Sequence, residues 1–181
     1  PLIGDHQLEN AKTAFAAIEA LRKQGVEISE KAVIEGFRHV DWPGRFEILK
    51  KEPLIIIDGA HNPESFRSLA RTVKDYLPDK KVFLVFGISE DKNLASMLKI
   101  IKPITDTLII TKSLHPRAMD PMIISDIAQS LGIQYISTDT VESAVKKAES
   151  LADKNSVIIA AGSIFIAGAF REVLLTNDRV K

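Results

Sequence analysis

Hydrophobic positions follow two different patterns along the chain. In the first forty residues they recur at helical spacing, which predicts one helix over residues 10–23, ending at Gly25. Ser29 is a suitable N-cap for a second helix that continues through His39. From about residue 46, short apolar runs instead alternate with amphipathic stretches. The change of pattern predicts a short helical segment followed by an α/β domain.

The second pattern predicts a sheet of mostly parallel strands. Its apolar runs are mostly continuous, as expected for strands that are buried on both faces. The runs occupy residues 54–57, 82–86, 108–110, 133–136 and 157–161. Phe46–Leu49 adds a short edge strand, and helical spacing predicts helices over residues 66–77 and 141–152. The fold class is therefore α/β, with an open sheet and flanking helices.

Pro43 and Gly44 interrupt both patterns and mark the best linker in the chain. They divide it into residues 1–41, a hinge at 42–45 and a domain over 46–181, which at about 135 residues is long enough for its own core. The first part is too short for a core, so we expect it to pack on a segment outside this chain. Together with the start at Pro1, this predicts a piece of a longer protein.

Composition narrows the possible functions. The 24 Lys and Arg residues balance 24 Asp and Glu residues, which argues against binding nucleic acid or a membrane surface through bulk charge. The absence of cysteine excludes disulfides, thiolate metal sites and a Cys nucleophile, and fits a cytoplasmic protein. No apolar run approaches the roughly 20 residues of a membrane span.

The sharpest candidate site directly follows the first apolar run, at residues 58–63. Asn62 is a good N-cap and Pro63 a good first residue for the helix that follows, whose N-terminal N–H groups favour an anion. Asp58 can accept two hydrogen bonds, as the hydroxyls of a ribose require. In the alternative interpretation, Asp58 only caps its loop and His61 is a surface residue.

Other candidates are weaker when each is taken alone. Arg45 can clamp a phosphate, or be solvated, and Asn10 can meet an adenine edge, or cap a helix. Ser163 can cap the last helix or bind a carboxylate with its N-terminus, and Lys92 can meet an anionic substrate. The segment His115–Arg117 is read as a turn or an anion contact. No P-loop, zinc-hydrolase or nucleophile-elbow motif occurs, so the chain contains no complete active site.

Taken together and in order, these motifs resemble folylpolyglutamate synthase/dihydrofolate synthase, a member of the Mur ligase superfamily. The matching segments are GDHQLENAKTA at residues 4–14, WPGRFE at 42–47, DGAHNP at 58–63, FGISEDK at 86–92 and GSIFIAG at 162–168. The resemblance covers essentially the whole chain. It implies a Rossmann-like C-terminal domain, preceded by the last helical part of a central ATPase domain. The P-loop, the magnesium ligands and most of the folate pocket would lie upstream of Pro1.

The resemblance also implies roles for single residues. Asn10 would contact the adenine of ATP, Arg45 the phosphates and Asp58 the ribose, with His61 nearby. Lys92 and Ser163 would hold the incoming L-glutamate. The implied reaction joins glutamate to dihydropteroate or to a reduced folate through an acyl phosphate, with ATP and Mg²⁺, and the fragment alone would be inactive. Two alternatives stay open: a stand-alone nucleotide-binding or interaction module without catalysis, and another amide ligase of the Mur type.

Overall fold

The computed structural model describes residues 2–179, which divide into two compact units, Pro1–Pro43 and Gly44–Lys181. The first unit holds two helices, α1 (Asp5–Lys23) and α2 (Glu30–Arg38). The predicted cap is confirmed, since the Ala32 amide donates to Ser29 Oγ at 3.1 Å. Helix α1 begins earlier than predicted because its first turn is almost wholly polar and gives no apolar periodicity. Of the described residues in this unit, Val33 alone is buried, so the unit has almost no core of its own.

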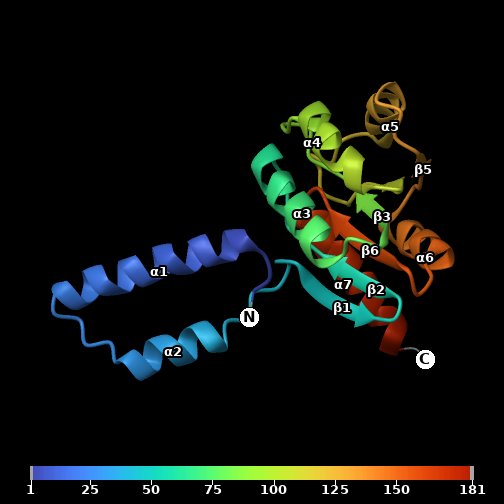
Figure 1. The fold of residues 1–181 in the computed structure, drawn as a ribbon. Helices are drawn as coiled ribbons and strands as arrows, with labels where there is room; N and C mark the ends of the chain where they lie inside the picture. The colour runs from blue at the N-terminus through green and yellow to red at the C-terminus, as the bar shows by residue number, and fades with distance from the viewer. Residues whose placement is uncertain (1, 180–181) are drawn as a thin grey trace. The chain divides into compact units, whose positions relative to one another are not determined.

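The second unit is a six-stranded sheet in the order β1-β2-β6-β3-β4-β5 (Figure 1). Only the edge strand β1 is antiparallel to its neighbour; the other four pairings are parallel. The strands are β1 (Glu47–Lys51), β2 (Leu54–Ile57), β3 (Lys81–Phe86), β4 (Thr107–Ile110), β5 (Tyr135–Ser137) and β6 (Ser156–Ala161). The predicted α/β class, the parallel sheet and the short edge strand are therefore confirmed.

Helices lie between the strands along the chain. They are α3 (Pro63–Tyr76), α4 (Leu94–Ile101), a 3₁₀ turn η1 (Lys102–Ile104), α5 (Pro121–Ser130), α6 (Val141–Leu151) and α7 (Ile164–Arg179). The predicted helices correspond to α3 and α6, whereas the sequence analysis assigned neither α4 nor α5. Asn62 caps α3 and Pro63 is its first residue, as predicted.

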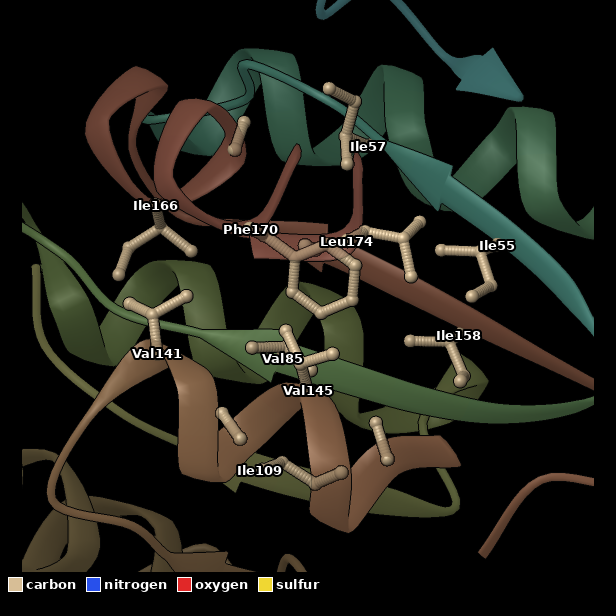
Figure 2. Packing of buried hydrophobic residues seen from close by; sticks show 14 of the residues in the cluster. Ile55, Ile57, Val85, Ile109, Val141, Val145, Ile158, Ile166, Phe170 and Leu174 are labelled. Carbon is tan, nitrogen blue, oxygen red and sulfur yellow. The ribbon is translucent and has the colours of Figure 1, made fainter. Parts of the chain in front are cut away.

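The sheet is buried on both faces. On one face, Phe170 and Leu174 of α7 pack with Val145 of α6 against side chains of β2, β3, β4 and β6 (Figure 2). On the other face, the ring of Phe66 in α3 meets that of Phe86 in β3 edge-on, with centroids 5.9 Å apart. Burial on both sides explains why the strands read as continuous apolar runs rather than alternating ones.

One predicted strand is displaced, and its end residue shows why. Ile133 is buried, but it lies before β5 and belongs to the C-terminal cap of α5. Its amide donates to the Ala128 carbonyl at 2.9 Å, and the amide of Gly132, at φ +65°, donates to Gln129. This is the hydrogen-bond pattern of a Schellman cap, in which an apolar residue after the glycine packs back on the helix. The apolar run therefore contains the end of a helix as well as a strand.

Candidate functional site

A hollow of about 250 Å³ lies where the parallel strands end, within the second unit. It is formed by the segments that follow β2, β3, β4 and β6, together with the segment that precedes β1. The described residues that line it are Arg45, Gly59, His61, Ser89, Asp91, Lys92, Arg117, Gly162, Ser163, Ile164 and Phe165. Ligands of open α/β sheets bind at the carboxyl ends of the strands. Four of the predicted site residues thus share one hollow: Arg45, His61, Lys92 and Ser163.

Asp58 holds two segments of backbone in place beside this hollow. Its Oδ1 accepts a hydrogen bond from the Ala60 amide at 2.8 Å, and its Oδ2 accepts one from the Phe46 amide at 2.9 Å. Asp58 therefore caps its loop and also ties the segment before β1 to the end of β2.

The histidine of the same loop has a defined orientation. His61 Nδ1 lies 2.9 Å from the Gly59 carbonyl oxygen, which can only accept, so Nδ1 carries the proton in this bond. In the neutral ring, Nε2 is then an acceptor. His61 thus contributes an acceptor, or after protonation a cation, at the wall of the hollow.

Arg45 lies between two residues with left-handed backbone conformations, Gly44 at φ +76° and Phe46 at φ +45°. Glu47 Oε2 accepts the Gly44 amide at 2.7 Å, and Glu47 Oε1 accepts from Arg171 Nε at 3.0 Å. The Gly59 amide donates to the Gly44 carbonyl at 2.8 Å. These bonds hold the backbone on both sides of Arg45, so its guanidinium is presented from a constrained turn.

Lys92 and Arg117 come from two loops that are joined by backbone hydrogen bonds. The Glu90 amide donates to the Arg117 carbonyl at 3.1 Å, and the Met119 amide to the Ile88 carbonyl at 2.8 Å. Because these bonds join the loops after β3 and β4, they bring the two cations to the same hollow. The turn predicted as one alternative for residues 115–117 is present, and Arg117 lines the hollow; its contact with an anion stays a prediction.

The hollow also contains a carboxylate that was not predicted as a site residue. Asp91 Oδ2 accepts a hydrogen bond from Lys92 Nζ at 2.8 Å. This bond, together with the positive charges of Lys92 and Arg117, holds the pKa of Asp91 below its ordinary value, so the group is ionised at neutral pH. Asp91 directly precedes Lys92 in the FGISEDK motif, and that motif was the available signal.

Ser163 caps the last helix, as one of the two interpretations predicted. Its Oγ accepts the Ile166 amide at 3.1 Å, and the residue is buried. Gly162, at φ +116°, lets the ends of β6 and β3 approach closely, because a Cβ there would meet the Gly87 carbonyl oxygen. A Cβ at Gly87 would meet the Thr111 carbonyl oxygen, which follows β4. Phe165 beside Ser163 stacks on the His115 ring, with centroids 3.9 Å apart. The N-terminus of α7 therefore forms one wall of the hollow.

Asn10 belongs to the first unit, where it is exposed on α1 and donates to Gln7 Oε1 at 3.0 Å. Its proposed contact with adenine stays a prediction. Within residues 2–179, no group of three His, Asp or Glu side chains comes together in a way that could hold a metal ion. No helix in that part of the chain is both long and apolar enough to cross a membrane.

An open α/β sheet whose carboxyl edge carries cations from three loops and a helix N-terminus defines a Rossmann-like domain suited to anionic ligands. Comparison with known proteins identifies the family. Residues 44–164 match the family model described as Mur ligase, glutamate ligase domain, and the chain belongs to this family.

Three similar proteins refine the comparison. A probable bifunctional folylpolyglutamate synthase/dihydropteroate synthase of Halobacterium salinarum is 34% identical over 94% of this chain and 20% of its own length. Dihydrofolate synthase/folylpolyglutamate synthase of Bacillus subtilis is 29% identical over 96% of this chain and 40% of its own. The solved structure of Mycobacterium tuberculosis folylpolyglutamate synthase complexed with ADP and AMPPCP superposes with a TM-score of 0.87 at 29% identity, covering 96% of this chain and 41% of that one. The resemblance drawn from the motifs is confirmed, and the chain spans between 20% and 41% of the length of these relatives.

Proposed function

We propose that this chain is part of an ATP-dependent ligase that joins L-glutamate to dihydropteroate, to a reduced folate, or to both. The observation that carries the proposal is the convergence of Arg45, Lys92 and Arg117 on one hollow beside the Ser163 helix N-terminus. Such a hollow suits the phosphate and carboxylate groups on which this reaction depends. The names of the three relatives, and the nucleotides in the solved complex, support the same reaction class.

The two units have different proposed origins. Residues 1–41 would be the end of a central ATP-binding domain that carries the P-loop, residues 42–45 the hinge, and residues 46–181 the C-terminal domain. In this assignment the chain completes the ATP and glutamate sites but does not contain a whole active site. The nearly coreless first unit supports it, because helices with so little buried surface fold stably only against further protein.

On the nucleotide side, Arg45 would reach the phosphates, Asp58 the ribose, with His61 nearby, and Asn10 the adenine. The constrained turn around Arg45 supports the first of these roles, since a bidentate arginine needs a fixed approach. The second role is supported by the position of Asp58, directly before Gly59 in the lining of the hollow. Lys92 and Ser163 would hold L-glutamate, and Arg117 adds a second cation for it.

The proposed chemistry has two steps. The γ-phosphoryl group of ATP passes to the carboxylate of the folate substrate, which gives an acyl phosphate and ADP. The amine of glutamate then attacks the acyl carbon, the bond from carbon to the phosphate oxygen breaks, and an amide and inorganic phosphate result, while the amine loses its proton. Charge accumulates on phosphate oxygens in both steps, and placed cations such as Arg45 stabilise it. Closure of the two domains about the hinge would exclude water.

Phosphoryl transfer of this kind uses Mg²⁺ by analogy with other ATP-dependent enzymes. The described residues offer no cluster of carboxylates or histidines that fits such an ion. We therefore assign no metal ligand to this chain, and no step above runs through one.

The test is an assay of the complete natural protein that contains this chain. It measures ADP release with ATP and L-glutamate, once with dihydropteroate and once with tetrahydrofolate as acceptor. We expect turnover with at least one acceptor, loss of most of it in Arg45→Ala, and near-normal turnover in the matched surface variant Arg67→Ala, whose side chain lies outside the hollow. Nucleotide binding without any turnover would favour a non-catalytic module, and turnover only with nucleotide-linked peptides would favour another Mur-type ligase.

A further inference from the structure

The hollow is lined by both positive and negative side chains, so a ligand with only negative charges does not match all of it. Three cations line it, but of the described residues around it, Asp91 also presents a carboxylate. A carboxylate in such a place repels phosphate and competes for the neighbouring cations. It suits a ligand that carries a positive group as well, and an amino acid is such a ligand.

The loops on either side hold Asp91 in this position. The Lys92 amide donates to the Ser89 carbonyl at 3.2 Å, and the backbone bonds between the β3 and β4 loops place Arg117 on the other side. The side chain of Asp91 is 49% exposed, and that of Lys92 is 33% exposed. The carboxylate thus keeps acceptor positions open after it has bound Lys92.

We propose that Asp91 is a specificity-determining residue that binds the ammonium group of the incoming amino acid and thereby rejects dicarboxylates that lack it. The inference rests on the proposed function, in which this hollow receives L-glutamate. Lys92 then pairs with a ligand carboxylate, and the ligand ammonium takes over the contact with Asp91. A ligand without the ammonium leaves Asp91 facing a second carboxylate, which raises the free energy of binding.

Asp91 is assigned to binding and not to proton removal. Its lowered pKa makes it a weak acceptor of a proton from an ammonium group, so it stabilises the charged amine before reaction. Substrate can displace the Asp91–Lys92 pair readily, because both side chains are partly exposed and exposed ion pairs are weak.

The experiment titrates the 181-residue chain with L-glutamate and with glutarate, which has the same two carboxylates and no ammonium. Backbone amide NMR shifts report binding even at millimolar affinity. We expect wild type to prefer L-glutamate by about five-fold, as for a single partly exposed ion pair. In Asp91→Asn the preference should disappear, mainly because glutarate binds more tightly. Glu90→Gln removes a charge from the same loop, outside the lining of the hollow, and should keep the wild-type ratio.

Each outcome is decisive. Absence of binding by both ligands to wild type overturns the proposed amino-acid site itself. If wild type binds L-glutamate and glutarate equally, the hollow does not select for the ammonium group. If Asp91→Asn keeps the wild-type preference for L-glutamate, Asp91 is not the residue that produces it. If the amide spectrum shows that Asp91→Asn is misfolded, Asp91→Ser removes the same charge and carries the same expectation.

Discussion

Replacing Asp58 by alanine tests whether this carboxylate holds the loops around the candidate site. In the folded chain it accepts the amides of Phe46 and Ala60, at 2.9 and 2.8 Å. These two residues flank the turn that presents Arg45 and the loop that presents His61. Alanine removes both acceptors and leaves two backbone N–H groups without them.

The magnitude follows from the burial of the two donors. Phe46 is 5% exposed and Ala60 is fully buried, so water can replace the lost acceptors only in part. A buried donor left without a partner costs about 1–3 kcal/mol. Two such donors give an expected loss of about 2–6 kcal/mol in the free energy of unfolding. At roughly 2–4 °C per kcal/mol for a domain of this size, Tm should fall by about 10 °C.

The measurement is urea denaturation of the 181-residue chain, followed by circular dichroism, with calorimetry for Tm. Asp79→Ala is the matched control, because Asp79 is an exposed aspartate in the turn before β3. We expect the control to remain within about 0.5 kcal/mol of wild type. If Asp58→Ala unfolds at the same urea concentration as Asp79→Ala, the two hydrogen bonds do not hold the loops, and the structural role of Asp58 is refuted.

Three further outcomes can be measured on the same chain. Gly162→Ala should lower the free energy of unfolding by at least about 2 kcal/mol, because φ is +116° there and a Cβ would meet the Gly87 carbonyl; wild-type stability in urea would contradict this. The hydrogen bond from Ser156 lowers the pKa of Asp153 in the folded chain. The ionised Asp153 should therefore contribute fully to the free energy of unfolding above the unfolded pKa of about 3.9, and this contribution should vanish as pH falls through the folded pKa. The stability difference between wild type and Asp153→Asn should therefore shrink from pH 7 to pH 3, and a constant difference would argue against the pair. Phe170→Ala, in the centre of the core, should cost about 3–5 kcal/mol, and a smaller calorimetric change would mean that the cavity collapses.

Helices and strands could be predicted where the pattern of apolar and capping residues fits only one type of secondary structure. The run at residues 54–57 is β2 without a shift, because a short apolar stretch of three isoleucines and one leucine, bounded by Pro53 and Asp58, is typical of a buried strand. Asn62 and Pro63 marked the start of α3 for a similar reason, since few other positions suit that pair. Helix α4 has only eight residues, and Ser96 and Lys99 are its only polar ones, so little more than two turns show its period and it was not assigned.

The individual residues of the candidate site could be predicted, but their arrangement around one hollow could not. Arg45, His61, Lys92 and Ser163 were each found from a motif, and the hollow that they share depends on which strands become neighbours. Strand β6 is inserted between β2 and β3, so the chain's last strand brings Ser163 between two earlier loops. The contribution of Arg117 depends on backbone bonds between the β3 and β4 loops, and no local sequence pattern encodes such bonds.

The cations of the hollow differ in whether a carboxylate is paired with them, and this difference bears on which ligand each cation suits. The net charge of the chain is zero, so any attraction for anions is local and depends on which cations already have partners. Lys92 is hydrogen-bonded to Asp91, whereas the described residues provide no ion pair or hydrogen bond for the Arg45 guanidinium. Two carboxylates bind the backbone on either side of Arg45: Glu47 accepts the Gly44 amide, and Asp58 accepts the Phe46 amide. A cation without a carboxylate partner, such as Arg45, suits a phosphate, which carries only negative charge. A cation paired with a carboxylate, such as Lys92 with Asp91, suits an amino acid, which carries a positive and a negative group. Under the proposed function, Arg45 would therefore serve the nucleotide, and the Asp91–Lys92 pair would serve the amino acid.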